Sequence, residues 1–393
     1  MSFALYSLAS SLHSGLQDIH NEAFIKDIQE ALGEDFEIFG EDFSTYGTHN
    51  TDVIYIRTGG TEGLFQDLKL KGEIRLLTSG ESNSLAAAME ILSYVNAGGG
   101  KGEILHGSAG HIAGRLHSPI SVKDQSEWIR ELPPIDLEGA RLGVIGRPSD
   151  WLIASDVNYD EAASRLGAKL IDIDIDELVS EVRATGCNLR SFEGSEAIYT
   201  ALSGIVRKYA LDGITVRCFD LLDSLGNTGC LALARLNAEG IPSSCEGDIP
   251  ALLSMVIAAK LCGCPGFQCN LSRITDEGLI FAHCTVPLSM VSSYTYDTHF
   301  ESGIGTAIRG RLPEGEVSIF KVSPDLRNMV VIPGRIARNL TEKKLCRTQV
   351  LVEAPGAAEY FLNSPLANHH IIVPGKLHQA GCHSPVDILN ELI

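Results

Sequence analysis

Two acidic residues stand close together in residues 243–254, which read SSCEGDIPALLS. Glu246 and Asp248 follow a short strand-like segment and precede an apolar, helix-like run that begins near Pro250. Ligands bind at the carboxyl ends of parallel strands in open α/β sheets. Glu246 lies at such a strand end, so it is a candidate ligand-binding or catalytic residue. Asp248 has a second interpretation, because an aspartate just before a first-turn proline is typical of a helix N-cap.

Four further polar residues lie at or within predicted strands. Asp220 closes the segment RCFD, His283 lies inside a strand pattern, and His369 and His370 open the last strand pattern. Each has a structural alternative: Asp220 can cap a helix, His283 can be a hydrogen-bonded core histidine, and the histidine pair can be a solvated strand end. Taken together, carboxylates and imidazoles suit a divalent ion such as Mn²⁺, Mg²⁺ or Co²⁺.

Composition narrows the class of protein. The 393 residues are 44% hydrophobic with a net charge of -19, which predicts large cores and opposes nucleic-acid binding. No apolar run approaches the roughly 18 residues that a membrane span needs, and the first residues lack a basic leader pattern. We therefore expect a cytoplasmic protein whose ten cysteines are reduced. The spacing of Cys262, Cys264 and Cys269 lacks the second half of a zinc pattern.

Two kinds of periodicity divide the chain. Short β-branched runs alternate with helical patterns over the first two thirds, which predicts parallel sheets covered by helices. After about residue 266, short strands separated by Gly, Pro and Asp turns predict an antiparallel β-barrel. The predicted architecture is α/β, with two Rossmann-like parallel-sheet domains at 1–138 and 139–265 and a C-terminal barrel domain at 266–393. Neither a P-loop nor a G-x-G-x-x-G after a strand is present, so no nucleotide cofactor is expected.

Eight motifs, spread in order over nearly the whole chain, carry a family resemblance. They are TGGTE (58–62), NSLAAAMEIL (83–92), RLGVIGRPSDWLIAS (141–155), RCFD (217–220), ARLNAEGIPSSCEGDIPALLS (234–254), AHCTVPLS (282–289), THFESGIG (298–305) and NHHIIVPG (368–375). With these motifs the chain resembles the L-fucose isomerase / L-arabinose isomerase superfamily, in particular its shorter fucose-isomerase-like members. The resemblance implies two α/β domains and a barrel, aldose–ketose isomerisation with a divalent metal, usually Mn²⁺, and a homo-oligomer, trimeric or hexameric.

The resemblance also implies a metal site. It assigns Glu246, Asp248 and His283 as ligands and completes the set with a histidine of the terminal NHH, for which we take His369. Asp220 lies near the position where fucose isomerases place an acidic ligand and base. The second glutamate of arabinose isomerases has no clear counterpart here, and the nearest residue is Asn270. The alternatives are therefore a non-catalytic carbohydrate-binding or regulatory protein, and a metal-assisted hydrolase or lyase.

Isomerisation through an enediol needs one group to move a carbon-bound proton and another to move a hydroxyl proton. Glu246, Asp248 and Asp220 are the predicted catalytic residues, and the metal would chelate adjacent sugar oxygens. Other loops would hold the sugar, and the predicted substrate-binding residues are Thr61, Glu62, Arg217, Trp151 and His370, with His299 and Glu301 as secondary candidates. If this site exists, His369 or His370 must lie within about 10 Å of Glu246, since direct coordination spans roughly 2 Å per ligand.

Overall fold

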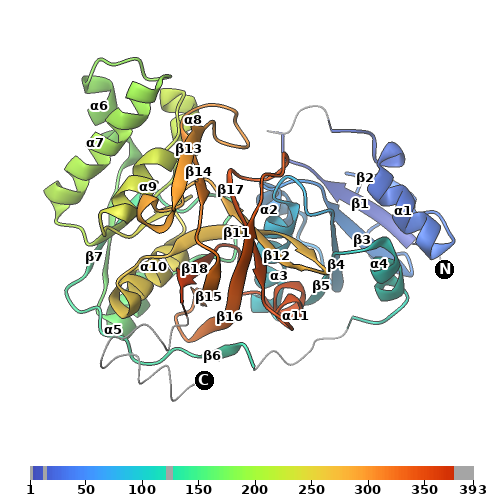
Figure 1. Ribbon diagram of the computed structural model, residues 1–393. Coiled ribbons are helices and arrows are strands. Elements are labelled where there is room, and N and C mark those ends of the chain that lie inside the picture. The colour runs from blue at the N-terminus through green and yellow to red at the C-terminus, as the bar shows by residue number, and fades with distance from the viewer. Residues whose placement is uncertain (1–2, 12–15, 121–126, 376–393) are drawn as a thin grey trace.

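The N-terminal part of the chain forms a parallel five-stranded sheet. The structure is a computed structural model that describes residues 3–11, 16–120 and 127–375 (Figure 1). The strand order is β2-β1-β3-β4-β5. The strands are β1 (Phe3–Leu8), β2 (Glu37–Gly40), β3 (Thr51–Ile56), β4 (Glu73–Thr78) and β5 (Lys101–Leu105). One face packs on α1 (Ala23–Leu32) and α4 (Ala109–Leu116), the other on α2 (Glu62–Leu68) and α3 (Ser84–Ala97).

Alternation along each strand explains this two-sided packing. Val53 and Tyr55 of β3 belong to the apolar cluster with α1 and α4, whereas Ile54 and Ile56 belong to the cluster with α2 and α3. Successive side chains on a strand point to opposite faces, so a continuous apolar run requires cover on both sides. A short 3-10 helix, η1 (Ile19–Asn21), precedes α1.

The middle part of the chain forms a second parallel sheet, with strand order β10-β9-β7-β8. Its strands are β7 (Arg141–Ile145), β8 (Lys169–Ile173), β9 (Gly213–Val216) and β10 (Ser243–Cys245). Apolar clusters place α5 (Tyr159–Leu166) and α10 (Ile249–Cys262) on one face of this sheet. The other face packs on α6 (Ile175–Ala184), α7 (Phe192–Tyr209), α8 (Asp220–Leu225) and α9 (Cys230–Ala238).

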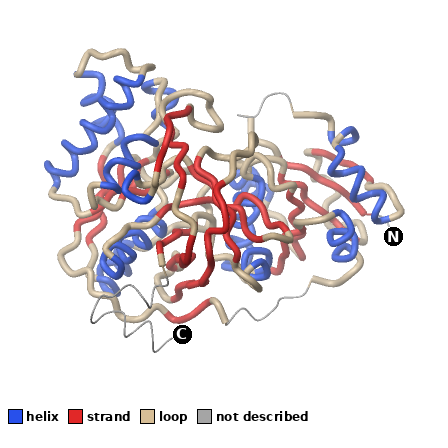
Figure 2. Tube along the Cα trace, viewed as in Figure 1, coloured by secondary structure: helices blue, strands red, loops and turns tan. Residues whose placement is uncertain are grey.

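The C-terminal part forms a closed antiparallel barrel, as Figure 2 shows by the strands gathered at its centre. The ring runs β15-β18-β11-β12-β17-β16, and pairing of β15 with β16 closes it. Its strands are β11 (Phe267–Thr275), β12 (Gly278–His283), β15 (Gly315–Val322), β16 (Asn328–Asn339), β17 (Thr348–Glu353) and β18 (His370–Pro374). The prediction of two parallel sheets followed by an antiparallel barrel is therefore confirmed.

A β-hairpin, a 3-10 helix, a short α-helix and one further strand accompany the barrel strands. A hairpin of β13 (Ser293–Asp297) and β14 (Ala307–Arg311) follows the 3-10 helix η2 (Leu288–Met290), and α11 (Ala358–Asn363) precedes β18. Strand β6 (Ile129–Glu131), which the sequence patterns did not predict, pairs with the start of β16. Strand β17 pairs only with residues 335–339 of β16, so residues 328–330 of β16 would form an exposed edge, and β6 pairs with them. The two domain boundaries, near residues 138 and 265, remain predictions.

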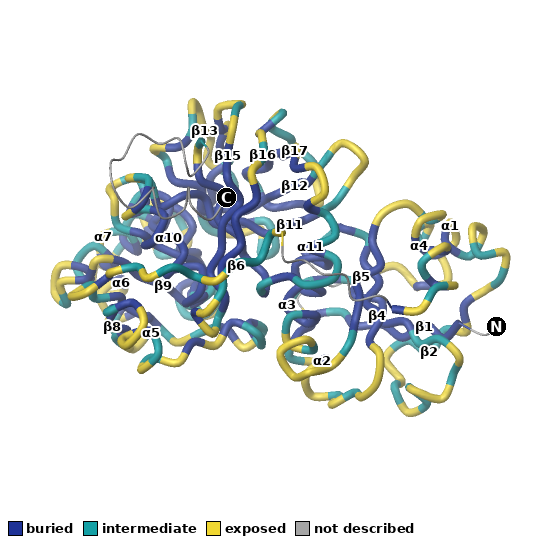
Figure 3. Tube along the Cα trace, turned by 90° about the horizontal axis from the view of Figure 1, so that it is seen from below, coloured by how far each residue is buried: buried dark blue, intermediate teal, exposed yellow. Residues whose placement is uncertain are grey.

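Two nearly apolar helices join the parallel sheets to the barrel. Residues 84–92 of α3 and 249–258 of α10 are all buried, and Figure 3 draws α10 and the barrel strands beside it in the colour of buried residues. Helix α3 contacts β11, and α10 contacts β15 and β18. The amino end of α10 therefore lies against the barrel, which brings Glu246 and Asp248 to the junction. Among the described residues, no helix is long and apolar enough to cross a membrane.

Candidate active site

Glu246 is held in an unusual backbone conformation between β10 and α10. Its φ is 66°, in the left-handed region that non-glycine residues seldom occupy. Its carbonyl oxygen accepts a hydrogen bond from the Ser149 amide at 3.0 Å. Gly247 also has a positive φ, and a Cβ atom there would lie 2.3 Å from the carbonyl oxygen of Arg147. The loop after β7 thus holds the backbone that aims Glu246, and such strain is concentrated at functional sites.

The Glu246 carboxylate is the meeting point of three side chains from distant parts of the chain. Its Oε2 accepts a hydrogen bond from Trp151 Nε1–H at 2.7 Å. Its Oε1 lies 3.3 Å from His369 Nε2 and 3.7 Å from His283 Nε2. The two imidazole rings are nearly perpendicular, with centroids 5.4 Å apart. The expectation that one of the two terminal histidines lies near Glu246 is confirmed, and that histidine is His369.

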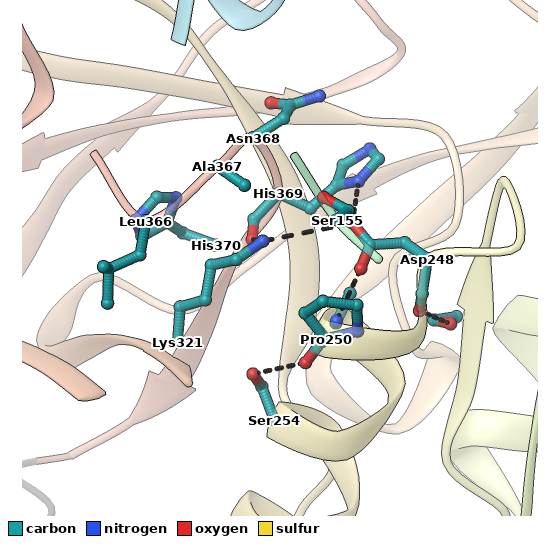
Figure 4. Close-up of polar contacts among 12 residues, drawn as sticks. Ser155, Asp248, Pro250, Ser254, Lys321, Leu366, Ala367, Asn368, His369 and His370 are labelled. Atoms are coloured by element: carbon teal, nitrogen blue, oxygen red, sulfur yellow. Dashed lines mark hydrogen bonds and ion pairs between the residues drawn. The ribbon is translucent and has the colours of Figure 1, made fainter. Parts of the chain in front are cut away.

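The Nδ1 atoms of His369 and His283, which face away from Glu246, both form hydrogen bonds. His369 Nδ1 is hydrogen-bonded to Asp248 Oδ2 at 2.9 Å, a contact drawn in Figure 4. His283 Nδ1 is hydrogen-bonded to the Thr285 hydroxyl at 2.8 Å. Both Nε2 atoms are therefore directed at the Glu246 carboxylate. Carboxylate–imidazole pairs of this kind orient metal-binding histidines in many proteins.

Asp248 is the helix N-cap that the sequence suggested as one alternative, and its second carboxylate oxygen contacts a histidine of the site. Its Oδ1 accepts the Ala251 amide at 2.7 Å, so it is the N-cap of α10, while Oδ2 faces His369. The side chain is completely buried, and Lys321 Nζ lies 4.0 Å from Oδ2. Lys321 is also completely buried and donates a hydrogen bond to the His369 carbonyl at 2.8 Å. This lysine therefore ties Asp248 to the strand that carries the histidine.

Charge pairing outweighs burial at these groups. Burial by itself raises the pKa of Glu246, but His369 and His283 lower it well below its usual range. Burial likewise opposes ionisation of Asp248, whose pKa is nevertheless lowered by Lys321 and His369. Burial disfavours protonated His369, yet Glu246 and Asp248 raise its pKa to about 10. The protein alone thus keeps both carboxyl groups ionised at neutral pH.

Glu90 of α3 connects the loops around the site. Its carboxylate accepts hydrogen bonds from the backbone amides of Ala154 at 2.7 Å and Asn368 at 2.8 Å. It also accepts the Ser155 hydroxyl at 3.0 Å. Because these partners lie in the segment after β7 and in the segment before β18, Glu90 fixes both next to α3. In the sequence this residue lies inside the motif NSLAAAMEIL (83–92), which did not indicate this role.

A pocket opens beside Glu246. Several of its polar atoms are buried and have no hydrogen-bond partner among the described residues. They are Glu62 Oε2, Asn83 Oδ1, Asn270 Oδ1 and Asn368 Oδ1. Unpaired buried oxygens are costly unless a ligand satisfies them, so this wall is suited to a molecule rich in hydroxyl groups. The sequence patterns did not predict a site role for Asn83 or Asn368, although these residues open the motifs NSLAAAMEIL and NHHIIVPG.

Other predicted residues also line this pocket. Trp151, Glu62 and Glu301 form part of its wall, as does Phe219. Glu301 Oε1 accepts a hydrogen bond from Asn83 Nδ2 at 2.7 Å. His299 stands behind Phe219, with the two ring centroids 5.5 Å apart, and its Nδ1 is hydrogen-bonded to Ser302.

The structure does not bring four of the predicted residues to the Glu246 carboxylate. The side chain of Asp220 is 41% exposed and pairs with Arg217 at 3.0 Å. Arg217 also donates two hydrogen bonds to the Asp150 carboxylate, at 3.1 and 2.7 Å. The Thr61 hydroxyl donates to the Thr58 carbonyl at 3.1 Å. Each of these three therefore has a structural contact of its own.

His370 is the fourth of these residues. Its imidazole lies against Tyr360, with Nε2 2.9 Å from the hydroxyl oxygen, and it is completely buried. Figure 4 shows the two neighbouring imidazoles on opposite sides of the chain. Neighbouring side chains on a strand point in opposite directions, so only one of His369 and His370 can face Glu246.

The donor atoms around Glu246 fit a divalent ion. Potential ligand atoms of Cys245, Glu246 and His283 all lie within 4.8 Å of one another, and His369 Nε2 approaches the same Glu246 oxygen. His369 Nε2 is buried and forms no hydrogen bond within the described residues. Imidazole and carboxylate ligands together suit a divalent ion such as Mn²⁺, Mg²⁺ or Co²⁺. Cys245 Sγ lies 2.9 Å from Cys218 Sγ, and that contact and burial raise its pKa well above the usual range, which keeps it a thiol.

Comparison with known proteins finds relatives that share one name. No family model matches the sequence. The chain is 27% identical over 227 residues to proteins called sulfoquinovose isomerase from Priestia megaterium and Priestia aryabhattai, covering 50% of this chain and 51% of each relative. A sulfoquinovose isomerase from a Clostridium species is 28% identical over 167 residues, which cover 40% and 37% of the two chains. The chain thus spans about half the length of the curated relatives it matches.

Proposed function

We propose that this protein is a divalent-metal-dependent sugar isomerase that interconverts an aldose and a ketose through an enediol. The observation that carries the proposal is the convergence of two imidazole Nε2 atoms on one oxygen of Glu246, at 3.3 and 3.7 Å. The opposite nitrogens are held by Asp248 and Thr285. Similarity to sulfoquinovose isomerases and the resemblance to L-fucose and L-arabinose isomerases support the same reaction.

The residues that would hold the metal are Glu246, His283 and His369. Asp248 is fully buried and uses both oxygens for other contacts, so its proposed role is to orient His369 rather than to bind the metal or remove a proton. The bound ion would polarise the sugar carbonyl and stabilise the enediolate. Mn²⁺ is the proposed metal, with Mg²⁺ and Co²⁺ as alternatives.

A pocket carboxylate other than Glu246 must move the carbon-bound proton. Glu246 is engaged by Trp151 and the two imidazoles. Glu301 lines the same pocket and is positioned by Asn83 at 2.7 Å, on the loop between β13 and β14. We therefore assign Glu301 as the base in place of Asp220, whose side chain is 41% exposed and paired with Arg217.

The charge of the pocket favours an uncharged sugar as the substrate. Its described lining includes Glu62, Glu246 and Glu301 but no lysine or arginine. A sulfonate, which the relatives' named substrate carries, would find no cationic side chain in this lining, whereas hydroxyl groups would meet Asn83, Asn270 and Asn368. Trp151 offers an apolar ring at the same wall.

The test uses purified full-length protein stripped of metal with a chelator. Mn²⁺ should raise the melting temperature and restore ketose formation from at least one of a panel of pentoses and hexoses, with sulfoquinovose turned over more slowly. A non-catalytic sugar-binding protein is the second candidate, because Asn270 lines the pocket near where a second carboxylate is expected. Sugar binding without turnover at saturating Mn²⁺ would establish that alternative and refute the isomerase.

We also propose a cytoplasmic location and an oligomeric state for this protein. All cysteines within the described residues are free thiols, which supports a cytoplasmic enzyme of carbohydrate metabolism. The trimer or hexamer implied by the family resemblance remains a proposal, which sedimentation or light scattering of the purified protein would test.

A further inference from the structure

A second carboxyl group is buried in the same pocket as Glu246. Glu62 is the first residue of α2, directly after the turn that follows β3, and it is only 3% exposed. Its side chain lines the pocket, and Oε2 has no hydrogen-bond partner among the described residues. An unpaired carboxyl oxygen in a buried wall is explained most simply by a group of the substrate that pairs with it.

The surroundings of Glu62 and Glu246 affect ionisation in opposite directions. Burial raises the pKa of Glu62 to about 8, and the nearby acidic groups Glu90, Glu246 and Glu301 add to the rise against its own backbone amide. The histidines lower the pKa of Glu246. Two carboxyl groups in one pocket with separated pKa values are typical of an acid and a charged partner that divide the work of catalysis.

We propose that Glu62 is a catalytic residue that carries the hydroxyl proton between the two sugar oxygens during isomerisation. This inference rests on the proposed function. It also supplies the acid–base group that is missing at Asn270, because a carboxyl group releases and regains a proton at neutral pH whereas an amide does not.

The proton transfers balance over one turnover. From an open-chain aldose, the base takes the proton on C2, the C–H electron pair forms the C1–C2 double bond, and the carbonyl electrons move to O1. The O1 atom takes the proton of Glu62, which gives the neutral enediol and an ionised Glu62. The hydroxyl proton on O2 then returns to Glu62, O2 becomes the carbonyl oxygen, and C1 receives the proton held by the base. Glu62 ends the cycle protonated, as it began.

The variant Glu62→Gln tests this role because glutamine has the size and neutrality of a protonated glutamate but cannot donate and regain the proton. We expect kcat to fall about 10²- to 10⁴-fold, with KM and the Mn²⁺-induced shift in melting temperature nearly unchanged. The matched control is Asn270→Ala, a neutral pocket residue whose loss should act mainly on KM. Circular dichroism checks the fold, and Glu62→Asp keeps a carboxyl group should the glutamine variant misfold.

The pH profile separates a proton carrier from a mere binding group. For the wild type, kcat/KM should fall above about pH 8, as Glu62 loses its proton in the free enzyme. Glu62→Asp should keep an alkaline limb at lower kcat, and the residual activity of Glu62→Gln should lack it. If the wild type is active and Glu62→Gln is equally active, the proposed role of Glu62 is wrong, but the proposed isomerase function still stands. A wild type that isomerises no aldose would instead refute the proposed function.

Discussion

Replacing Asp248 with asparagine separates its two roles within one side chain. Asparagine caps helices about as well as aspartate, so the bond to the Ala251 amide is kept. The variant removes the negative charge that lies 2.9 Å from His369 Nδ1 and 4.0 Å from Lys321 Nζ. All three side chains are completely buried, so solvent cannot replace the lost charge.

Two magnitudes follow for Asp248→Asn. Removing one partner of a buried ion pair costs about 3–5 kcal/mol, and we expect the low end because Glu90 also acts on Lys321 electrostatically. Loss of the carboxylate behind a metal-binding histidine typically weakens metal binding about 10- to 100-fold. Asparagine can also donate its amide N–H to Nδ1, which would leave the proton on Nε2, the nitrogen that faces Glu246.

Urea unfolding and calorimetric titration with Mn²⁺ measure the two effects separately. The control is Asp174→Asn, since Asp174 caps α6 through the Asp176 amide but is exposed and away from the site. That control should leave both the unfolding free energy and Mn²⁺ affinity unchanged. If Asp248→Asn matched the control in both measurements, Asp248 would be only a helix cap and our account of His369 would be wrong.

Three further predictions concern the pocket carboxylates. Glu246→Gln should stay folded by circular dichroism but lose most Mn²⁺ affinity in titration, and unchanged affinity would place the metal elsewhere. Glu301→Gln should lower kcat at least about 100-fold whereas Asp220→Asn should not, and the reverse order in a rate assay would restore Asp220 as the base. Native Glu62 keeps its proton up to about pH 8, whereas unfolded Glu62 loses it near pH 4.5. The free energy of unfolding should therefore fall between about pH 4.5 and pH 8, by up to about 5 kcal/mol for this residue. Glu62→Gln should remove this slope in urea titrations, and an unaltered slope would contradict the burial of a protonated carboxyl group.

Much of the fold could be predicted because its signals are local. The apolar run at 52–58 and the strand-to-helix change at 243–254 appear within a few neighbouring residues, so periodicity alone indicates parallel strands and helices. Asp248 could be predicted as a helix cap for the same reason. Strand β6 escaped prediction because its three residues carry little pattern, and its pairing with β16 depends on an edge formed almost 200 residues later in the chain.

The site depends on distances along the chain that no local pattern spans. The sequence by itself placed Glu246 at a strand end and left His369 and His370 equivalent. Only the register of β18 in the closed barrel decided that His369 meets Asp248, 121 positions away, while His370 faces Tyr360. Tertiary packing likewise decided that Asp220 is half-exposed and paired with Arg217, and that Glu62 is buried near other carboxyl groups. Burial and charge are properties of the assembled surroundings, so they emerge only when sheets and barrel come together.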